Sequence, residues 1–588
     1  MSLSVLSSLT TGSSTPLPSR RAIAASPAAS VHAAATALPP PPNPVAVVRG
    51  IQLAILRAAV LLVNNTPLRN VFEKLIPPIT LPQTTGIRLI GVPTGFALSN
   101  APPSTVLSPD GTQLYQVTVP IIASGFFGWH SPSYSTLTVI DAKTNAVVGH
   151  PINFQGEPAG PLVVSPDGTR VYMTSTVWSG GSAVASYVTT IDTSTATVVG
   201  TPVKFAGWTF GGPVLSPDGS RLYQATSAVG FTQTITAIDT ATGTVAGTPL
   251  ILSGGGVVGG LVLSSDGSRL SLTTQTANLA DGKPQTVYIA VVDAADISLI
   301  SRVTLTGAAA GGVVMSPDST GAAQAVTLGT TTSITYIDLT DGSVAWTATA
   351  DGSSIYSVYA PMFSDNGSRV SVITAENSSP RVTVYDTSNG DVVGTLALPG
   401  ATTGETTALV PDPSGNRLFV AAGAYTGPTF VTVVDTSNGI MVGDPVSVPG
   451  FGRLVASADG SSVYLPTIAG DYPNTSKFVV INGEGVVTGT ADMPGGIGHV
   501  LVGPGDGRVY LLNSTDERRQ LIALDAVTAA ILGPAIALDG WKSYDLVLNP
   551  DGTKIYDTTV ADNTQPNFWS LLTSLYVTRV AVLDTAAI

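Results

Sequence analysis

One pattern of apolar and polar positions recurs ten times between about residue 100 and the end of the chain. Each copy begins with an apolar run, turns at a segment related to Ser-Pro-Asp-Gly, and continues as a strand of alternating apolar and polar residues. A loop of variable length follows, then a β-branched strand that ends at Asp, a second turn and a last strand. Alternation with a period of two is typical of half-buried β-strands. The pattern therefore predicts four short antiparallel strands in each copy, here named A to D in chain order.

The turn between strands A and B has the same composition throughout. Pro presets the first central dihedral angle of a turn, Asp can bond its own backbone, and Gly adopts positive φ. The ten turns begin at residues 108, 165, 216, 264, 316, 364, 412, 457, 503 and 549. The ten C strands end at Asp141, Asp192, Asp239, Asp293, Asp338, Asp386, Asp435, Asn482, Asp525 and Asp584. One such sheet cannot cover its own faces, so radial stacking of the copies predicts an all-β propeller of about ten four-stranded repeats.

The last copy stops four residues after Asp584, before a fourth strand. A spare alternating segment, residues 86–93, precedes the first copy and ends in Gly-x-Pro as several D strands do. We expect this strand to complete the last blade and to tie the ends of the chain together. Typical propellers have four to eight blades. The sequence is compatible with one wide ring or with two rings, and the uninterrupted array favours one.

The residues before the repeats have a different composition. Residues 1–43 are rich in Ala, Ser and Pro and predict a disordered leader. Two arginines at 20–21 before a run of small residues are compatible with an export signal, and a leader without a targeting role is the alternative. Residues 44–83 predict an amphipathic helical segment and a linker. Within it, Arg49 and Arg57 make residues 45–63 a poor membrane span, and favour a helix that docks on the propeller or makes peripheral membrane contact. The propeller is assigned to residues 84–588.

Charge and cysteine content exclude several classes of chemistry. Only 11% of the residues are charged, the net charge is −13, and no run of Lys or Arg occurs. Such a chain lacks the basic stripe that nucleic-acid binding needs, so we expect no nucleic-acid partner. The absence of Cys excludes disulfides, thiolate zinc sites and Cys nucleophiles.

Two of the copies carry a family resemblance. The first reads GPLVVSPDGTRVY at 160–172, followed by YVTTIDTSTATVVGTPV at 187–203. The second reads GGPVLSPDGSRLY at 211–223, followed by ITAIDTATGTVAGTPL at 235–250. These segments resemble the repeats of YVTN-family β-propellers, which include the bacterial YncE-like proteins. The resemblance covers about residues 84–588 and implies a WD40-like propeller fold, but its residues are turn and core positions that say little about function. The leader resembles those of exported mycobacterial proteins, so we expect an exported protein, at the cell envelope or outside the cell.

Few residues are candidates for chemistry. Of the four histidines, His130 and His499 fall where a propeller could use them as ligand or base, although an ordinary loop or edge position explains each. No His spacing is typical of a metal site. Turn geometry explains the many Asp residues, so we expect no cofactor, with calcium held by one or two of the turns as the alternative.

The tryptophans gather on one predicted face. In a propeller the B–C and D–A loops lie on the same face, and the B–C loops are expected at 117–135, 174–186 and 558–575. These two kinds of loop contain five of the six tryptophans: Trp129, Trp178, Trp208, Trp541 and Trp569. They belong to blades 10, 1, 2 and 3, which are neighbours in a closed ring. Exposed aromatic side chains on loops favour a binding surface for a protein, peptide or glycan. The alternative is that they cap the sheet ends or cover the amino-terminal helix.

The sequence therefore favours a non-enzymatic binding scaffold that uses the B–C and D–A loops, with His130 and His499 near the same face. The alternative is a hydrolase or lactonase-like enzyme at the mouth of the ring, built from one of these histidines and nearby carboxylates such as Asp545. A purely structural scaffold is the third hypothesis. It requires the tryptophans to be buried, whereas the binding hypothesis requires them to be exposed and contiguous.

Overall fold

The computed structural model describes most of the repeat region and none of the preceding segment. The described residues are 87–91, 105–118, 134–179, 182–209, 211–228, 230–276, 284–354, 360–376, 379–399, 406–423, 427–469, 475–505, 507–515, 519–538, 542–562 and 576–587. The chain divides into two units, residues 1–77 and 78–588, and all described residues belong to the second. The predicted leader at 1–43 and the helical segment at 44–83 lie outside the described residues.

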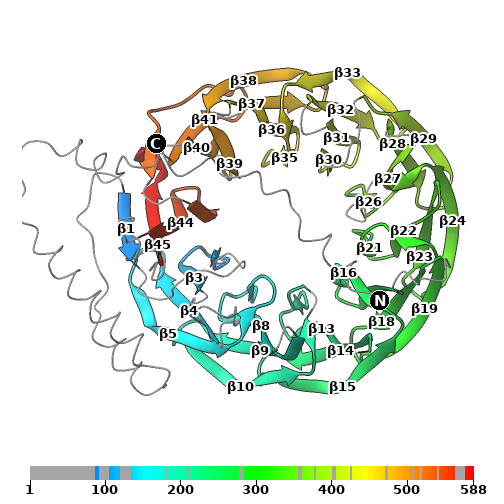
Figure 1. The fold of residues 1–588 in the computed structure, drawn as a ribbon, viewed down its shortest axis with the longest axis horizontal. Helices are drawn as coiled ribbons and strands as arrows, with labels where there is room; N and C mark the ends of the chain where they lie inside the picture. The colour runs from blue at the N-terminus through cyan, green and yellow to red at the C-terminus, as the bar shows by residue number, and fades with distance from the viewer. Residues whose placement is uncertain are drawn as a thin grey trace, which may run out of the picture. The chain divides into compact units, whose positions relative to one another are not determined.

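The described residues form ten antiparallel sheets arranged as one ring (Figure 1). The expectation of an all-β propeller of ten blades in a single ring is confirmed. In each blade strand A is innermost and strand D outermost (Figure 1). In five blades an irregularity splits strand A into two short strands. Apart from a short 3₁₀ turn, η2 (Thr585–Ala587), the described residues contain no helix.

Blades 1 to 5 follow one another in chain order. Blade 1 contains β2 (Thr105–Leu107), β3 (Gln113–Thr118), β4 (Tyr134–Asp141) and β5 (Val147–Gln155). Blade 2 contains β6 (Glu157–Pro158), β7 (Val163–Val164), β8 (Arg170–Ser179), β9 (Ser182–Asp192) and β10 (Thr197–Phe205). Blade 3 contains β11 (Trp208–Thr209), β12 (Val214–Leu215), β13 (Arg221–Ala228), β14 (Thr232–Asp239) and β15 (Thr244–Ser253). Blade 4 contains β16 (Gly256–Leu263), β17 (Arg269–Gln275), β18 (Thr286–Asp293) and β19 (Leu299–Thr306). Blade 5 contains β20 (Ala308–Ala309), β21 (Val314–Met315), β22 (Gly321–Leu328), β23 (Thr331–Asp338) and β24 (Val344–Asp351).

Blades 6 to 10 continue the same order. Blade 6 contains β25 (Ser353–Ser354), β26 (Met362–Phe363), β27 (Arg369–Glu376), β28 (Ser379–Asp386) and β29 (Val392–Ala397). Blade 7 contains β30 (Thr406–Pro411), β31 (Arg417–Gly423), β32 (Thr429–Asp435) and β33 (Ile440–Val448). Blade 8 contains β34 (Phe451–Gly452), β35 (Val455–Ala456), β36 (Ser462–Ala469), β37 (Thr475–Asn482) and β38 (Val487–Pro494). Blade 9 contains β39 (Gly496–Val502), β40 (Arg508–Ser514), β41 (Arg519–Asp525) and β42 (Ile536–Leu538). Blade 10 contains β43 (Lys542–Leu548), β44 (Lys554–Asp562), β45 (Tyr576–Asp584) and, from the start of the described chain, β1 (Ile87–Gly91).

Blade 10 is completed by a strand from the other end of the chain. β1 pairs antiparallel with β45, with Ile87 opposite Leu583 and Gly91 opposite Arg579. This is the pairing expected for the spare segment at 86–93. Because β45 would otherwise present an unpaired edge, β1 both closes the ring and protects that edge.

The apolar core lies between blades, where the face of one sheet packs on the next. One cluster joins Tyr115 and Leu137 of blade 1 to Met173 and Ile191 of blade 2, and all four side chains are at most 1% exposed. A second cluster closes the ring in the same way by packing Leu114 and Ile140 of blade 1 against Tyr556, Val580 and Val582 of blade 10. Burial of each such side chain contributes about 1.5–3 kcal/mol. The blades therefore stabilise one another, as the repeat pattern predicts.

The Ser-Pro-Asp-Gly turns also contact one another from blade to blade. Gly111 of blade 1 adopts positive φ and lies so close to Pro550 of blade 10 that an added Cβ would stand 2.8 Å from the ring Cδ. The same glycine-on-proline contact joins Gly219 to Pro166 and Gly267 to Pro217. Gly in this turn therefore meets two requirements at once, a left-handed backbone and close approach of the preceding blade.

Candidate functional site

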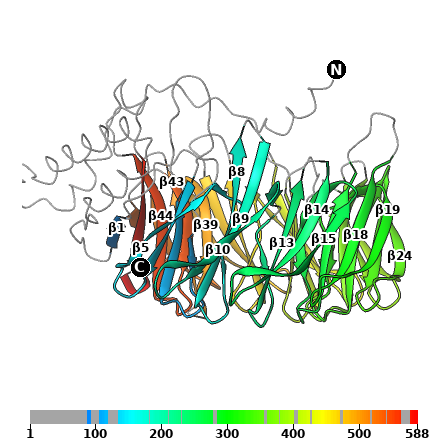
Figure 2. The same cartoon turned by 90° about the horizontal axis from the view of Figure 1, so that it is seen from below.

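The B–C connection of blade 2 is a long hairpin, and the loop expected at 174–186 is wrong. β8, of ten residues, continues to Ser179, and β9, of eleven residues, begins at Ser182, so strand replaces most of the expected loop. This hairpin rises beyond the neighbouring blades (Figure 2). The sequence contained the signal, because Gly180-Gly181 between β-branched and small residues is typical of a two-residue hairpin turn.

The hairpin carries exposed apolar side chains near its tip. Trp178, one of the predicted binding residues, lies on β8 and is 40% exposed. Val184 on β9 is 53% exposed. On the neighbouring blade, Phe231 follows β13 in the turn that precedes β14, has a φ of 59° and is 52% exposed. The sequence analysis did not single out Val184 or Phe231.

Trp208 lies beside this hairpin. It is on β11, the first half of strand A of blade 3, rather than in the expected D–A loop. β11 contacts both β8 and β9 of blade 2, and Trp208 is half-buried there. The side chains of Trp178 and Trp208 therefore belong to adjacent elements of two neighbouring blades.

Four of the predicted binding residues lie outside the part of the chain that the structure describes: Trp129, His130, Trp541 and Trp569. The gathering of five tryptophans on one surface therefore stays a prediction. Trp346, the sixth, is on strand D as expected, where it stacks on Tyr336 with 5.3 Å between the ring centroids.

His499 and Asp545 lie on neighbouring inner strands, β39 of blade 9 and β43 of blade 10. Burial raises the pKa of the Asp545 carboxyl and outweighs three smaller effects that lower it: the hydrogen bond from the Thr105 amide, the nearby His499 and the hydrogen bond from the Leu546 amide. The Thr105 N–H donates to Asp545 Oδ2 at 2.8 Å across the junction of blades 1 and 10. The structure thus brings His499 near Asp545, the carboxylate that the sequence analysis named with it. Asp545 also accepts the Thr105 amide and so links blades 1 and 10.

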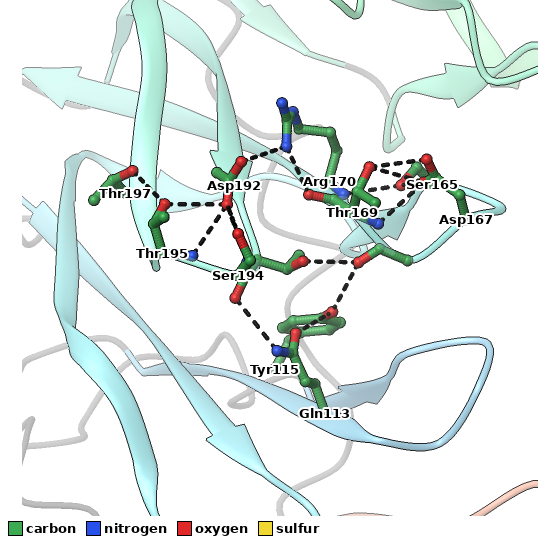
Figure 3. A network of polar contacts seen from close by, with 12 residues as sticks. Gln113, Tyr115, Ser165, Asp167, Thr169, Arg170, Asp192, Ser194, Thr195 and Thr197 are labelled. Atoms are coloured by element: carbon green, nitrogen blue, oxygen red, sulfur yellow. Dashed lines mark hydrogen bonds and ion pairs between the residues drawn. The ribbon is translucent and has the colours of Figure 1, made fainter.

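A second polar region lies on the opposite face, where the A–B and C–D turns meet between blades 1 and 2 (Figure 3). It encloses a cavity of about 420 Å³. The cavity is lined by Ser108, Asp110, Thr112, Gln113, Asp167, Gly168, Thr169, Arg170, Asp192, Thr193 and Ser194. We call this cavity the turn-face groove. Sequence reasoning treated its residues only as turn formers.

Hydroxyl groups hold the carboxylates of the groove in their ionised form. The Ser108 and Ser165 hydroxyls donate to Asp110 and Asp167, each at 2.6 Å, and lower the pKa of those carboxyls. The Ser194 hydroxyl lowers the pKa of Asp192 to about 2. With Arg170 as the one cation among the lining residues, three negative charges face one positive charge.

Within the described ranges, no three His, Asp or Glu side chains are grouped as a metal site requires. The described residues therefore provide no test of the calcium alternative. The described part of the chain also has no helix of the length and apolarity that a membrane crossing takes. The segment 45–63, expected to contact a membrane surface, lies outside that part.

Comparison with known proteins shows likeness in architecture alone. No family model matches the chain, and no curated protein does. Among solved structures, the "Dos1 propeller" is 15% identical and covers 62% of this chain and 90% of its own, with a TM-score of 0.39. The Cps50 (Swd1) β-propeller domain of Myceliophteria thermophila is 14% identical and covers 53% and 94%, with a TM-score of 0.28. The dihydro-heme d1 dehydrogenase NirN is 16% identical and covers 66% and 75%, with a TM-score of 0.37. A propeller fold is compatible with a binding scaffold or with an enzyme.

Proposed function

We propose that this protein is a non-enzymatic binding scaffold that recognises a protein or peptide through the hairpin of blade 2 and the adjacent edge of blade 3. The observation that carries the proposal is the raised β8–β9 hairpin, which exposes Trp178 and Val184 near its tip. Large apolar side chains held by rigid strands bind partners with little loss of conformational entropy. Phe231 extends the apolar character to blade 3.

The mixture of side chains favours a polypeptide over a glycan as the partner. A sugar ring stacks on an aromatic face, but gains nothing comparable from an aliphatic side chain. Val184 is as exposed as any aromatic residue of this region, and aliphatic groups are buried readily in protein interfaces. Glycan binding is therefore the alternative outcome of the test.

We further propose that the scaffold is exported and acts at the cell envelope, and that its repeats are of the YVTN type. The composition of residues 1–43 supports export, and the Ser-Pro-Asp-Gly and Ile-Asp-Thr segments support the repeat type. Fusion of residues 1–43 to a reporter enzyme that is active only after export tests the first point.

The binding proposal is tested by selecting peptides from a displayed random library against the immobilised full chain, with a glycan array in parallel. We expect selected peptides to lose at least tenfold in affinity when Trp178→Ala or Val184→Ser is introduced. Val392→Ser is the matched control, because Val392 is 52% exposed on the outer strand of blade 6. Equal losses in Val392→Ser and Val184→Ser, or no loss in Trp178→Ala, would contradict the proposal. Binding to the glycan array alone would indicate that this surface recognises a glycan instead of a polypeptide.

The enzyme alternative has one observation in its favour, the proximity of His499 to Asp545. A general base needs a neighbour of this kind to hold or accept a proton. Hydrolysis of ester or lactone substrates that disappears in His499→Ala and persists in Trp178→Ala would favour the enzyme over the scaffold.

A further inference from the structure

The first residue of strand B is a cation in seven of the ten blades. These residues are Arg170, Arg221, Arg269, Arg369, Arg417, Arg508 and Lys554. Four of them form an ion pair with the Asp that ends strand C of the same blade, with N–O distances of 2.6 Å in blade 2, 3.2 Å in blade 4, 2.7 Å in blade 6 and 3.1 Å in blade 7. A positive charge therefore occupies this position in most of the blades.

Several of these cations also reach across to the next blade, where they donate to a backbone carbonyl just after the C-strand Asp. Lys554 Nζ donates to Ala142 O at 2.6 Å. Arg269 Nε donates to Leu339 O at 2.9 Å, and Arg508 Nη1 to Thr585 O at 3.2 Å. Arg221 makes the same contact with Ala295 O. At four junctions on the turn face, a strand-B cation thus contacts a main-chain oxygen of the next blade.

Blade 1 breaks this rule at the turn-face groove. Its B strand begins with Gln113, a neutral and shorter residue. The Gln113 Nε2 reaches the equivalent acceptor, Thr193 O, only at 3.4 Å, while its Oε1 accepts the Tyr115 hydroxyl at 2.9 Å (Figure 3). The cavity of about 420 Å³ lies at this junction, with Gln113 and Thr193 among its lining residues. Blade 1 therefore retains the acceptor of the repeat, Thr193 O, but places a neutral side chain before it.

The other two exceptions differ from blade 1 in the residues at and around the position. In blade 5 the position is Gly321, the Tyr336 ring packs over it, and Trp346 Nε1 donates at 2.8 Å to Thr387 O of blade 6. In blade 8 the position is Ser462, and the Asp that it would face is replaced by Asn482. In blade 1 the last residue of strand C is Asp141, which lies opposite Gln113. The turn-face groove beside it is lined by three carboxylates and one guanidinium.

We propose that the turn-face groove between blades 1 and 2 binds the guanidinium group of an arginine side chain presented by a partner peptide. The incoming group takes the place that a strand-B arginine fills in blades 3 and 4. A planar guanidinium presents several N–H donors in a fixed fork, which suits a carbonyl and a carboxylate side by side. The net charge of −13 attracts cationic peptides over a distance. This site lies on the face opposite the β8–β9 hairpin and does not depend on the proposed function.

The test is calorimetric titration of the full chain with the peptide acetyl-Gly-Arg-Gly-amide at low ionic strength. The same peptide with citrulline is the neutral control of the same shape. Gln113→Arg restores the repeat residue and fills the groove from within, whereas Ser462→Arg adds the same charge in blade 8. We expect the arginine peptide to bind the parent and Ser462→Arg, to lose at least tenfold in affinity for Gln113→Arg, and the citrulline peptide not to bind.

A second variant keeps the proposal testable if Gln113→Arg folds poorly. Asp110→Asn removes one groove charge, and the turn tolerates it, because Asn366 occupies the same place in blade 6 and accepts the Ser364 hydroxyl at 2.7 Å. We expect a several-fold loss of affinity for the arginine peptide. Absence of binding by the parent, equal binding of the citrulline peptide, or unchanged affinity in both Gln113→Arg and Asp110→Asn would overturn the proposal.

Discussion

Ser319 Oγ lies 2.7 Å from Ser265 Oγ, across the junction between blades 4 and 5. Ser265 stands where most turns have Pro, and Ser319 stands where most have Gly, with a φ of 61°. The Ser319 Oγ also accepts the Asp266 N–H at 3.1 Å, and the Ser265 hydroxyl donates to Pro317 O at 2.6 Å. Two departures from the repeat thus compensate each other by replacing an apolar contact with hydrogen bonds.

The first prediction concerns this pair. Ser265→Pro alone places a proline ring against the Cβ of Ser319, and we expect a loss of about 1–3 kcal/mol in the free energy of unfolding from overpacking. Ser265→Pro with Ser319→Gly restores the contact seen between Gly267 and Pro217 and should recover most of the loss. Urea unfolding of the parent, both single variants and the double variant measures the coupling. Additive losses would show that the two serines act independently.

The local part of the fold could be predicted from the sequence, because the responsible signals lie within a few residues. Pro-Asp-Gly specified the A–B turns, and the alternation at 86–93 indicated the strand that pairs with β45. The long hairpin of blade 2 was not predicted, because the sequence analysis assigned Gly180-Gly181 to a loop and not to a hairpin turn. The length of a strand depends on pairing with its neighbour, which composition alone does not fix.

The polar sites were harder to predict because they arise between copies. His499 and Asp545 were named together only from their place in the repeats, and no sequence spacing links residues on different blades. The turn-face groove depends on one neutral residue, Gln113, where other copies have a cation. That difference is visible in the sequence, but its consequence depends on which carbonyl of the next blade lies opposite, here Thr193.

The second prediction concerns ring closure by β1. Replacement of Ile87–Gly91 by five Gly and Ser residues should weaken the pairing with β45 and leave an edge strand exposed. We expect the melting temperature to fall by several degrees and aggregation to increase with protein concentration. Differential scanning calorimetry and light scattering check both effects. Removal of residues 1–77, which retains β1, is the control, and an unchanged melting temperature in the β1 variant would contradict closure by this strand.

The third prediction concerns the half-buried carboxyl of Asp545. Its pKa is raised by burial, so the folded chain holds the proton more tightly than the unfolded chain, where the pKa is about 3.9. The ionised group therefore lowers stability above its raised pKa, and this effect vanishes as the pH falls below about 4. Asp545→Asn removes the charge and retains an oxygen that can accept the Thr105 N–H.

We therefore expect Asp545→Asn to be at least as stable as the parent at pH 7, and the difference to shrink toward pH 4. Urea midpoints at the two pH values measure it. Asp545→Ala is the comparison, because it removes the acceptor and should be less stable than Asp545→Asn at both. A stability gain of Asp545→Asn that grows on acidification would show that the sign of the pKa shift is wrong.

The fourth prediction concerns the ion pair between Arg519 of blade 9 and Asp557 of blade 10. The Arg519 Nη2 lies 3.1 Å and 2.9 Å from the two carboxylate oxygens, and the residues are only 5% and 0% exposed. The position of Asp557 is apolar in most other blades, for example Leu511 in blade 9 and Val420 in blade 7, both fully buried. Asp557→Leu alone buries the guanidinium without its carboxylate and should lower the free energy of unfolding by about 3–5 kcal/mol.

Arg519→Met together with Asp557→Leu removes both charges, and we expect this double variant to approach or exceed the stability of the parent. The reason is that desolvation of two buried ions offsets most of their mutual attraction, whereas one buried ion has no such compensation. Urea unfolding of the parent, of Arg519→Met, of Asp557→Leu and of the double variant gives the coupling free energy of the pair. If the double variant were as unstable as the sum of the single ones, the two side chains would stabilise the junction of blades 9 and 10 through separate contacts. In that case the other neighbours of the guanidinium, rather than the carboxylate, would explain why a charge is retained at a position that is apolar in most other blades.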